Sequence, residues 1–303
     1  MAGRVAGKGW GHTSMSEERL AVRKTYKLYI AGAFPRSESG RSYVVVDSDG
    51  AFLANAAQGS RKDVRDAVVA ARKAQPRWAG ATAYNRGQIL YRVAEMLDGR
   101  RAQFTDEVVS SEGVGPDEAV ARVDAAVDRW VWFAGWADKV AQVVGSSNPV
   151  AGPFFNFSVP EPTGVVGIVA PQASSLLGLV SVLAPVLVTG NTVVLLASET
   201  RPLPAITLAE VLATADIPGG VVNLITGRVG ELAPVLAAHR DVDALDLAGA
   251  PGPLLADLER AAVTNVKRVL RPDTCDGDWT TAPTPRRMLA FLETKTVWHP
   301  IGL

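Results

Sequence analysis

The chain has few of the side chains that most metal and disulfide sites require. Its 303 residues include one cysteine and three histidines. A single thiol excludes an intrachain disulfide framework and a zinc site built from several thiolates. Lys and Arg number 31 and Asp and Glu also number 31, so no overall field attracts a phosphate backbone or an anionic membrane. We expect no metal site and no nucleic-acid partner.

Long apolar runs are also missing. The longest, Leu176 to Val188, is interrupted by Gly178, Ser181 and Pro185 and is shorter than the roughly 20 residues that cross a bilayer. The N-terminal residues lack the apolar run of a secretion signal. The sequence therefore predicts no membrane partner and a cytoplasmic protein, whose 48% apolar content is enough for a substantial core.

Residues 161–272 show a regular alternation of short apolar strands and helical segments. Expected strands lie at 165–169, 192–196, 221–226, 244–247 and 266–270, and expected helices at 174–188, 203–214, 230–239 and 251–262. Short apolar strands separated by helices are typical of a parallel sheet buried on both faces. We therefore predict an α/β fold.

The earlier part of the chain is less regular. We interpret residues 1–24 as a flexible N-terminal arm and predict an antiparallel pair between 26–30 and 43–46. Helical spacing of apolar residues predicts helices at 63–78, 85–97 and 116–144. Residues 154–159, flanked by Pro153 and Pro160, are typical of an edge strand and predict an interface element.

Three segments, in order, resemble the cofactor-binding domain of the NAD(P)-dependent aldehyde dehydrogenases. They are residues 161–171 (EPTGVVGIVAP), 190–195 (GNTVVL) and 217–227 (IPGGVVNLITG). Residues 294–298 resemble the family's C-terminal strand, which joins an arm strand near 154–160 in the oligomerisation region.

The resemblance implies a division of the chain. A Rossmann-like cofactor-binding domain is expected at 25–145 and 161–272, and an oligomerisation arm at 146–160 and 288–303. It also implies a homo-oligomer, or a hetero-oligomer with a full-length aldehyde dehydrogenase.

The catalytic elements of that family are absent. Where the family has Trp-Asn, whose amide stabilises an oxyanion, this chain has Gln172 and Ala173. Where it has Glu-Leu-Gly-Gly, which contains the general base, this chain has Leu270-Arg271-Pro272-Asp273. The family's catalytic lobe of roughly two hundred residues, with its Gly-Gln-x-Cys motif, has no counterpart, so we expect the catalytic domain to be absent.

The resemblance still leaves candidates for cofactor contact: Glu199 for ribose hydroxyls, and Gly227, Arg228, Gly249 and Gly252 for the phosphates. For Gly227 and Arg228, a structural role in an ordinary strand-to-helix turn is as well supported as contact with a cofactor. The family lysine near Glu199 and the serine after Gly249 are missing. NAD or NADP binding is thus possible but weakened or lost.

Two other residues have specific interpretations. Cys275, the only possible nucleophile, is flanked by three carboxylates that disfavour a thiolate, so we interpret it as an unreactive loop residue. We interpret Glu112 as a solvated helix terminus.

Three hypotheses follow. The first is a catalytically inactive partner or regulatory subunit of a full-length aldehyde dehydrogenase. The second is an NAD(P)-dependent oxidoreductase acting on aldehydes through an atypical or shared active site. The third is a structural scaffold that binds no cofactor.

Overall fold

The computed structural model describes residues 24–272 and 277–302. Its centre is a five-stranded, wholly parallel sheet in the order β10-β9-β6-β7-β8. The strands are β6 (Val165–Val169), β7 (Thr192–Leu196), β8 (Val222–Ile225), β9 (Ala244–Asp246) and β10 (Arg268–Leu270). Four of the five are fully buried, as a sheet covered on both faces requires. The predicted α/β fold is confirmed.

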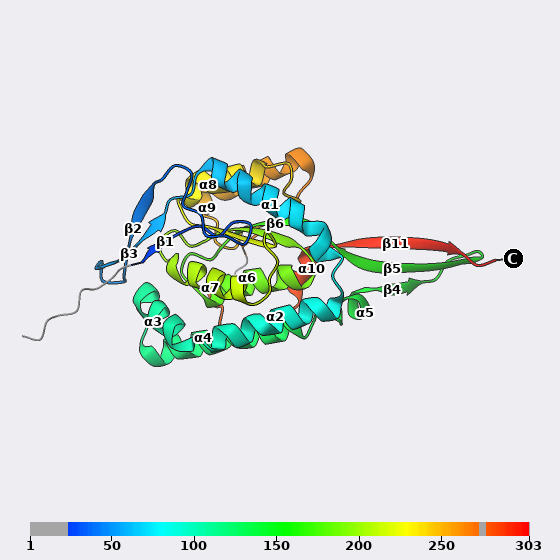
Figure 1. The fold of residues 1–303 in the computed structure, drawn as a ribbon. Coiled ribbons are helices and arrows are strands. Elements are labelled where there is room, and N and C mark those ends of the chain that lie inside the picture. Colours follow the sequence, from blue (N-terminus) through cyan, green and yellow to red (C-terminus); the bar gives the residue numbers. More distant parts are fainter. Residues whose placement is uncertain (1–23, 273–276, 303) are drawn as a thin grey trace, which may run out of the picture.

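Helices cover both faces of this sheet in unequal depth (Figure 1). One face is covered by a single layer: α1 (Arg61–Ala79), α8 (Val229–Ala238) and α9 (Gly252–Ala262). The other face is covered first by α6 (Leu177–Val188) and α7 (Leu203–Thr214), and then by α2 (Ala83–Asp98), α3 (Arg101–Glu112) and α4 (Pro116–Ala134). Every residue of α6 is buried because it lies between the sheet and the outer helices.

Local sequence signals explain where the outer helices begin and end. The Ser60 hydroxyl accepts from the backbone N–H of Asp63, whose carboxylate accepts from the N–H of Ser60, a capping box that starts α1. Pro116 occupies the first turn of α4. The predicted continuous helix 116–144 is wrong: α4 ends at Gly135, and only the short α5 (Val140–Val144) follows.

The N-terminal sheet corrects a second prediction. Its order is β1-β3-β2, with β1 (Thr25–Tyr26) parallel to β3 (Phe52–Ala57) and β2 (Ser42–Val46) antiparallel to it. The predicted direct pairing of 26–30 with 43–46 is therefore wrong, because β3 lies between the two. Tyr29 instead bridges to Leu224 and covers the edge of β8.

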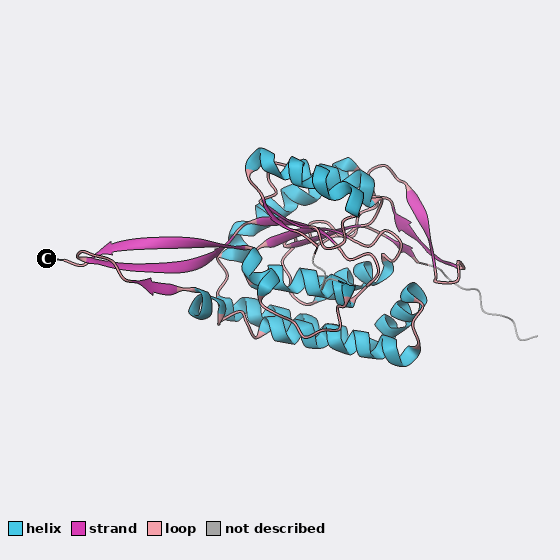
Figure 2. Cartoon of the chain, turned by 180° about the vertical axis from the view of Figure 1, so that it is seen from behind, coloured by secondary structure: helices cyan, strands magenta, loops and turns pink. Residues whose placement is uncertain are grey.

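A third sheet projects from the body as a long arm (Figure 2). Its order is β11-β5-β4, where β4 is Ser146–Asn148, β5 is Phe154–Pro162 and β11 is Leu292–Pro300. All nine residues of β5 pair with β11. The predicted pairing of these segments is present, but β5 is not an edge strand: β4 covers its other side at Asn156–Ser158.

The connection between β10 and β11 folds back onto the body. Its described part contains α10 (Arg286–Ala290), which contacts α6 and β10. Met288 and Phe291 are fully buried there. Cys275 lies outside the described residues. Within the described ranges, no helix is long and apolar enough to cross a bilayer, and no group of His, Cys, Asp and Glu side chains could hold a metal ion.

Candidate functional site

The carboxyl ends of the parallel strands meet at one edge of the central sheet. From β6 the chain runs outward to β7 and β8, then returns to the other side of β6 for β9 and β10. In open α/β sheets, ligands bind outside the carboxyl ends where the strand order reverses. The candidate crevice therefore lies beyond β6 and β9, bordered by the residues that follow β7 and β8.

Glu199 and Arg228, two of the predicted cofactor residues, are in direct contact in this region. Arg228 Nη1 donates to Glu199 Oε1 at 2.7 Å, and the backbone N–H of Val229 donates to Glu199 Oε2 at 2.9 Å. The carboxylate thereby caps the N-terminus of α8, where the helix dipole favours negative charge. The hydrogen bond to Glu199 raises the pKa of Arg228. The guanidinium also lies over the Tyr43 ring, 5.3 Å from its centroid.

The predicted glycines occupy three different settings. Gly227 has φ +145°, and a Cβ there would approach the Gly59 nitrogen at 3.0 Å. A Cβ on Gly249 would lie 1.8 Å from the Ala170 carbonyl oxygen, so this glycine permits β6 and β9 to pack closely at their ends. Gly252 begins α9 and has open space around it. Close packing alone accounts for the first two, and their roles toward a cofactor remain predictions.

Gln172 extends from the end of β6 but turns back into its own chain. Its Nε2 donates to the Ala170 carbonyl at 2.7 Å, and its Oε1 accepts from the Glu199 N–H at 2.9 Å. The amide is therefore a brace between the ends of β6 and β7. Beside it lies a pocket of about 360 Å³, whose wall includes Arg201 and Trp279.

Glu112 lies at the same pocket and is not solvated. Its side chain is 1% exposed and forms an ion pair with Arg122. It accepts from the N–H of Ser175 at 2.5 Å and from the Ser175 hydroxyl at 2.6 Å. The interpretation of Glu112 as a solvated helix terminus is wrong, because its carboxylate connects the end of α3 to the loop before α6.

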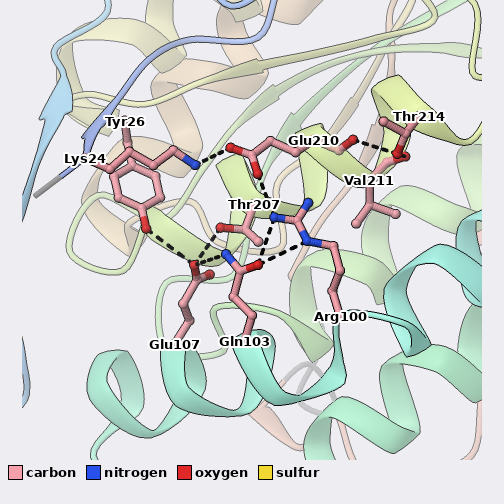
Figure 3. A network of polar contacts seen from close by, with 9 residues as sticks. All are labelled: Lys24, Tyr26, Arg100, Gln103, Glu107, Thr207, Glu210, Val211 and Thr214. Carbon is pink, nitrogen blue, oxygen red and sulfur yellow. Dashed lines mark hydrogen bonds and ion pairs between the residues drawn. The ribbon is translucent and has the colours of Figure 1, made fainter. Parts of the chain in front are cut away.

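A second polar cluster joins β1, α3 and α7 (Figure 3). Glu107 Oε1 accepts from the Thr207 hydroxyl at 2.7 Å, from Gln103 Nε2 at 3.2 Å and from the Tyr26 hydroxyl at 3.4 Å. Its Oε2 is buried without a hydrogen-bond partner within the described chain. Burial raises the pKa of Glu107, although the hydrogen bonds from Thr207 and Gln103 oppose the shift.

Glu210 completes this cluster on α7. It pairs with Lys24, and its Oε2 accepts from Arg100 at 2.7 Å. Burial disfavours the Glu210 carboxylate, but the hydrogen bonds from Lys24 and Arg100 outweigh it and lower its pKa. Lys24, the last residue of the predicted flexible arm, is thus held against α7; residues 1–23 lie outside the described chain. Sequence periodicity does not reveal this cluster, because its members come from segments far apart in the chain.

The family assignment rests on a direct match. The aldehyde dehydrogenase family model matches residues 34–270. This chain belongs to the aldehyde dehydrogenase family. It is 31% identical over 266 residues to mitochondrial 10-formyltetrahydrofolate dehydrogenase from Mus musculus, and 33% identical over 258 residues to the cytosolic enzyme of that name from Xenopus tropicalis.

Solved structures of aldehyde dehydrogenases show the same fold. HpcC from Thermus thermophilus superposes with a TM-score of 0.78 at 31% identity, covering 82% of this chain and 48% of HpcC. The NAD+ complex of aldehyde dehydrogenase from Bacillus cereus gives 0.77 at 25% identity, covering 82% and 50%.

The two formyltetrahydrofolate dehydrogenases are matched over 85% and 82% of this chain, but over only 28% of their own length each. The chain therefore spans little more than a quarter of the length of these relatives, and about half of HpcC and of the Bacillus cereus enzyme.

The contacts of residues 271–272 and 277–291 show how the chain continues after β10. Arg271, at the position expected for the family's Glu-Leu-Gly-Gly motif, forms an ion pair with Glu259 on α9. Arg287 of α10 forms an ion pair with the fully buried Asp246 of β9. The Asn191 amide donates to the Phe291 carbonyl at 2.8 Å. The connection is thus held to α9 at its start and beside the sheet near its end.

Proposed function

We propose that this chain is a non-catalytic member of the aldehyde dehydrogenase family that assembles with a full-length relative. The observation that supports the proposal most directly is the segment between β10 and β11, which replaces the expected lobe and keeps the arm strand. Residues 271–291 stand where the family resemblance implies a lobe, and they are anchored by Arg287 and Phe291. The same connection leads directly into β11, so the arm is retained.

The chemistry near the crevice supports the absence of catalysis. Ala173 has no amide to stabilise an oxyanion, and the neighbouring Gln172 amide is already bonded on both sides by Ala170 and Glu199. Arg271, bound to Glu259, cannot act as the general base. Loss of one oxyanion donor alone costs about a hundredfold or more in rate, so these losses together leave no efficient route for aldehyde oxidation.

The surface of the arm supports assembly. Phe154, Phe155 and Trp298 near its tip are 38%, 49% and 59% exposed. Over the described residues, the outer edge of β11 pairs with no other strand. A long edge strand with exposed aromatic side chains is a site of aggregation unless another chain covers it. A family member with a complementary arm is the partner that fits such an edge.

Co-expression tests this proposal. The chain is produced with a full-length aldehyde dehydrogenase from the same genome, and the complex is measured by native mass spectrometry. We expect a fixed subunit ratio that Trp298→Asp abolishes. Val44→Asp, at an exposed valine of β2 on the body, is the matched control and should leave the complex intact. A stable homo-oligomer that never incorporates the full-length chain would refute the proposed partnership.

A dinucleotide-binding role is the second candidate, because Glu199 lies at the end of the second strand of the parallel sheet, where a carboxylate can bind ribose hydroxyls. Its carboxylate already accepts from Arg228 and from the Val229 N–H, so we expect weak binding.

Titration of the isolated chain with NAD and with NADP measures the affinity, and Glu199→Gln should lower it further. If millimolar concentrations of both cofactors produce no change, the scaffold hypothesis is favoured.

A further inference from the structure

A small pocket lies between α4, α6 and the segment 278–287. Its volume is about 130 Å³, and the described residues of its wall carry four guanidinium groups and one carboxylate, Asp278. Two of the arginines are paired with carboxylates outside the pocket wall: Arg287 with Asp246, and Arg271 with Glu259. Arg286 also makes an interaction of its own. The fourth, Arg129, is in a different situation.

Arg129 is buried, with 7% of its surface exposed, yet it forms no ion pair with any residue that the structure describes. Its Nη1 donates to the Ser181 hydroxyl at 2.6 Å, and its Nη2 donates to the carbonyls of Trp279 and Thr281 at 2.8 and 2.7 Å. All three acceptors are neutral. One of the two Nη1 hydrogens and the Nε hydrogen make no bond to the described residues.

Such a cation is costly without a counter-ion. A guanidinium stays protonated under all ordinary conditions, and a buried charge is normally paired or bound to an ion of opposite sign. Burial indeed lowers the pKa of Arg129. The three neutral oxygens replace part of the hydration of the guanidinium, but they do not supply the negative charge of a counter-ion. The pocket beside it has room for one small ion.

We propose that this pocket binds a small oxyanion, such as a phosphate group, with Arg129 as the main ligand. The N–H groups that Arg129 leaves unused, on Nε and Nη1, can each donate a charge-assisted hydrogen bond to an oxygen of a bound phosphate or carboxylate. Among the described residues of the wall, Asp278 is the one carboxylate that would oppose a bound anion. This inference does not depend on the proposed subunit role.

An ion bound at Arg129 would also affect the segment that leads into α10. Arg129 holds the carbonyls of Trp279 and Thr281, which belong to the segment that leads into α10 and then β11. An oxyanion at Arg129 therefore stabilises this segment against α4 and α6. Occupancy of the pocket is expected to reduce amide hydrogen exchange in residues 277–291.

Calorimetric titration of the full chain with sodium phosphate tests the site, with chloride balancing the ionic strength. We expect saturable binding of one phosphate per chain, weakened about tenfold or more in Arg129→Gln, since a hydrogen bond to a charged group is strong. Arg92→Gln, at an exposed arginine of α2 paired with Asp216, is the matched control and should bind as the unaltered chain does. A parallel titration with acetate distinguishes a phosphate ligand from a carboxylate ligand.

Several outcomes would overturn the proposal. No saturable heat with either anion would do so, and so would equal phosphate affinity in Arg129→Gln, which would make Arg129 only a clamp for the two carbonyls. If circular dichroism shows that Arg129→Gln does not fold, Arg129→Lys replaces it. Lysine keeps the charge but loses the Nε–H and the planar guanidinium, so its phosphate affinity should fall. Unchanged affinity, together with unchanged hydrogen exchange in residues 277–291 on adding phosphate, would refute the site.

Discussion

At the scale of single residues, Gly249 and Gly252 separate packing from ligand binding. A Cβ on Gly249 would lie 1.8 Å from the Ala170 carbonyl, whereas one on Gly252 meets nothing within 4 Å. Gly249→Ala should therefore destabilise the fold by about 1–3 kcal/mol or more, as overpacking does. Gly252→Ala, the matched control in the first turn of α9, should change stability by less than about 1 kcal/mol. Urea unfolding of both variants checks this; equal stability would contradict the close approach.

Glu107 gives a prediction about pH at the same scale. Because burial raises its pKa above the ordinary value, its stabilising contribution is complete at pH values below that ordinary value. It is lost as the pH rises through the raised value. As the pH rises above the ordinary pKa of a glutamate, about 4.3, the unaltered chain should lose stability relative to Glu107→Gln, which cannot ionise.

The measurement is urea unfolding of both proteins at several pH values. Glu95→Gln, at an exposed position of α2, is the control and should follow the unaltered chain. Parallel stability curves for Glu107→Gln and the unaltered chain would show that the pKa of Glu107 is the same in the folded and unfolded chain, and would contradict the prediction.

At the scale of elements, the connection between β10 and β11 packs like a part of the core. Phe291 is fully buried at the end of α10, while Leu289 on the same helix is 41% exposed. We expect Phe291→Ala to cost about 3–5 kcal/mol, because it removes a large buried side chain and leaves a cavity. Leu289→Ala should cost much less. Thermal unfolding of both variants makes the comparison, and similar small losses would mean that the connection contributes little to stability.

At the scale of the whole molecule, the isolated chain should not oxidise aldehydes. The crevice has Ala173 and Arg271 at the positions expected for the family's oxyanion asparagine and general-base motif, and the chain covers only half of HpcC or less. Incubation with NAD or NADP and simple aldehydes should produce no increase in absorbance at the nicotinamide wavelength. A full-length family member in the same assay is the positive control. Turnover by the isolated chain, removed by Cys275→Ala, would instead support the oxidoreductase hypothesis.

The sequence predicted the central sheet well because each of its strands is a short apolar run with helices on both sides. The segments 165–169, 192–196 and 203–214 coincide with β6, β7 and α7. The sequence did not predict β3, because Phe52–Ala57 contains no β-branched residue. Only its pairing with β1 and β2 in the structure identifies it as a strand. The edge-strand prediction for β5 was also wrong: the flanking Pro153 and Pro160 suggested an edge, but β4 pairs only at Asn156–Ser158, where no proline interferes.

The sequence by itself determined the family and the parallel sheet, since these depend on local apolar patterns and on residues adjacent in the chain. It also predicts that the catalytic motifs are lost. Only the tertiary structure decided the contacts between distant segments. It joined Glu199 to Arg228, surrounded Glu107 with groups from β1, α3 and α7, and left Arg129 buried without a carboxylate from the described chain. The physical reason is that the energy of a charged group is set by its three-dimensional surroundings, which a linear pattern does not contain.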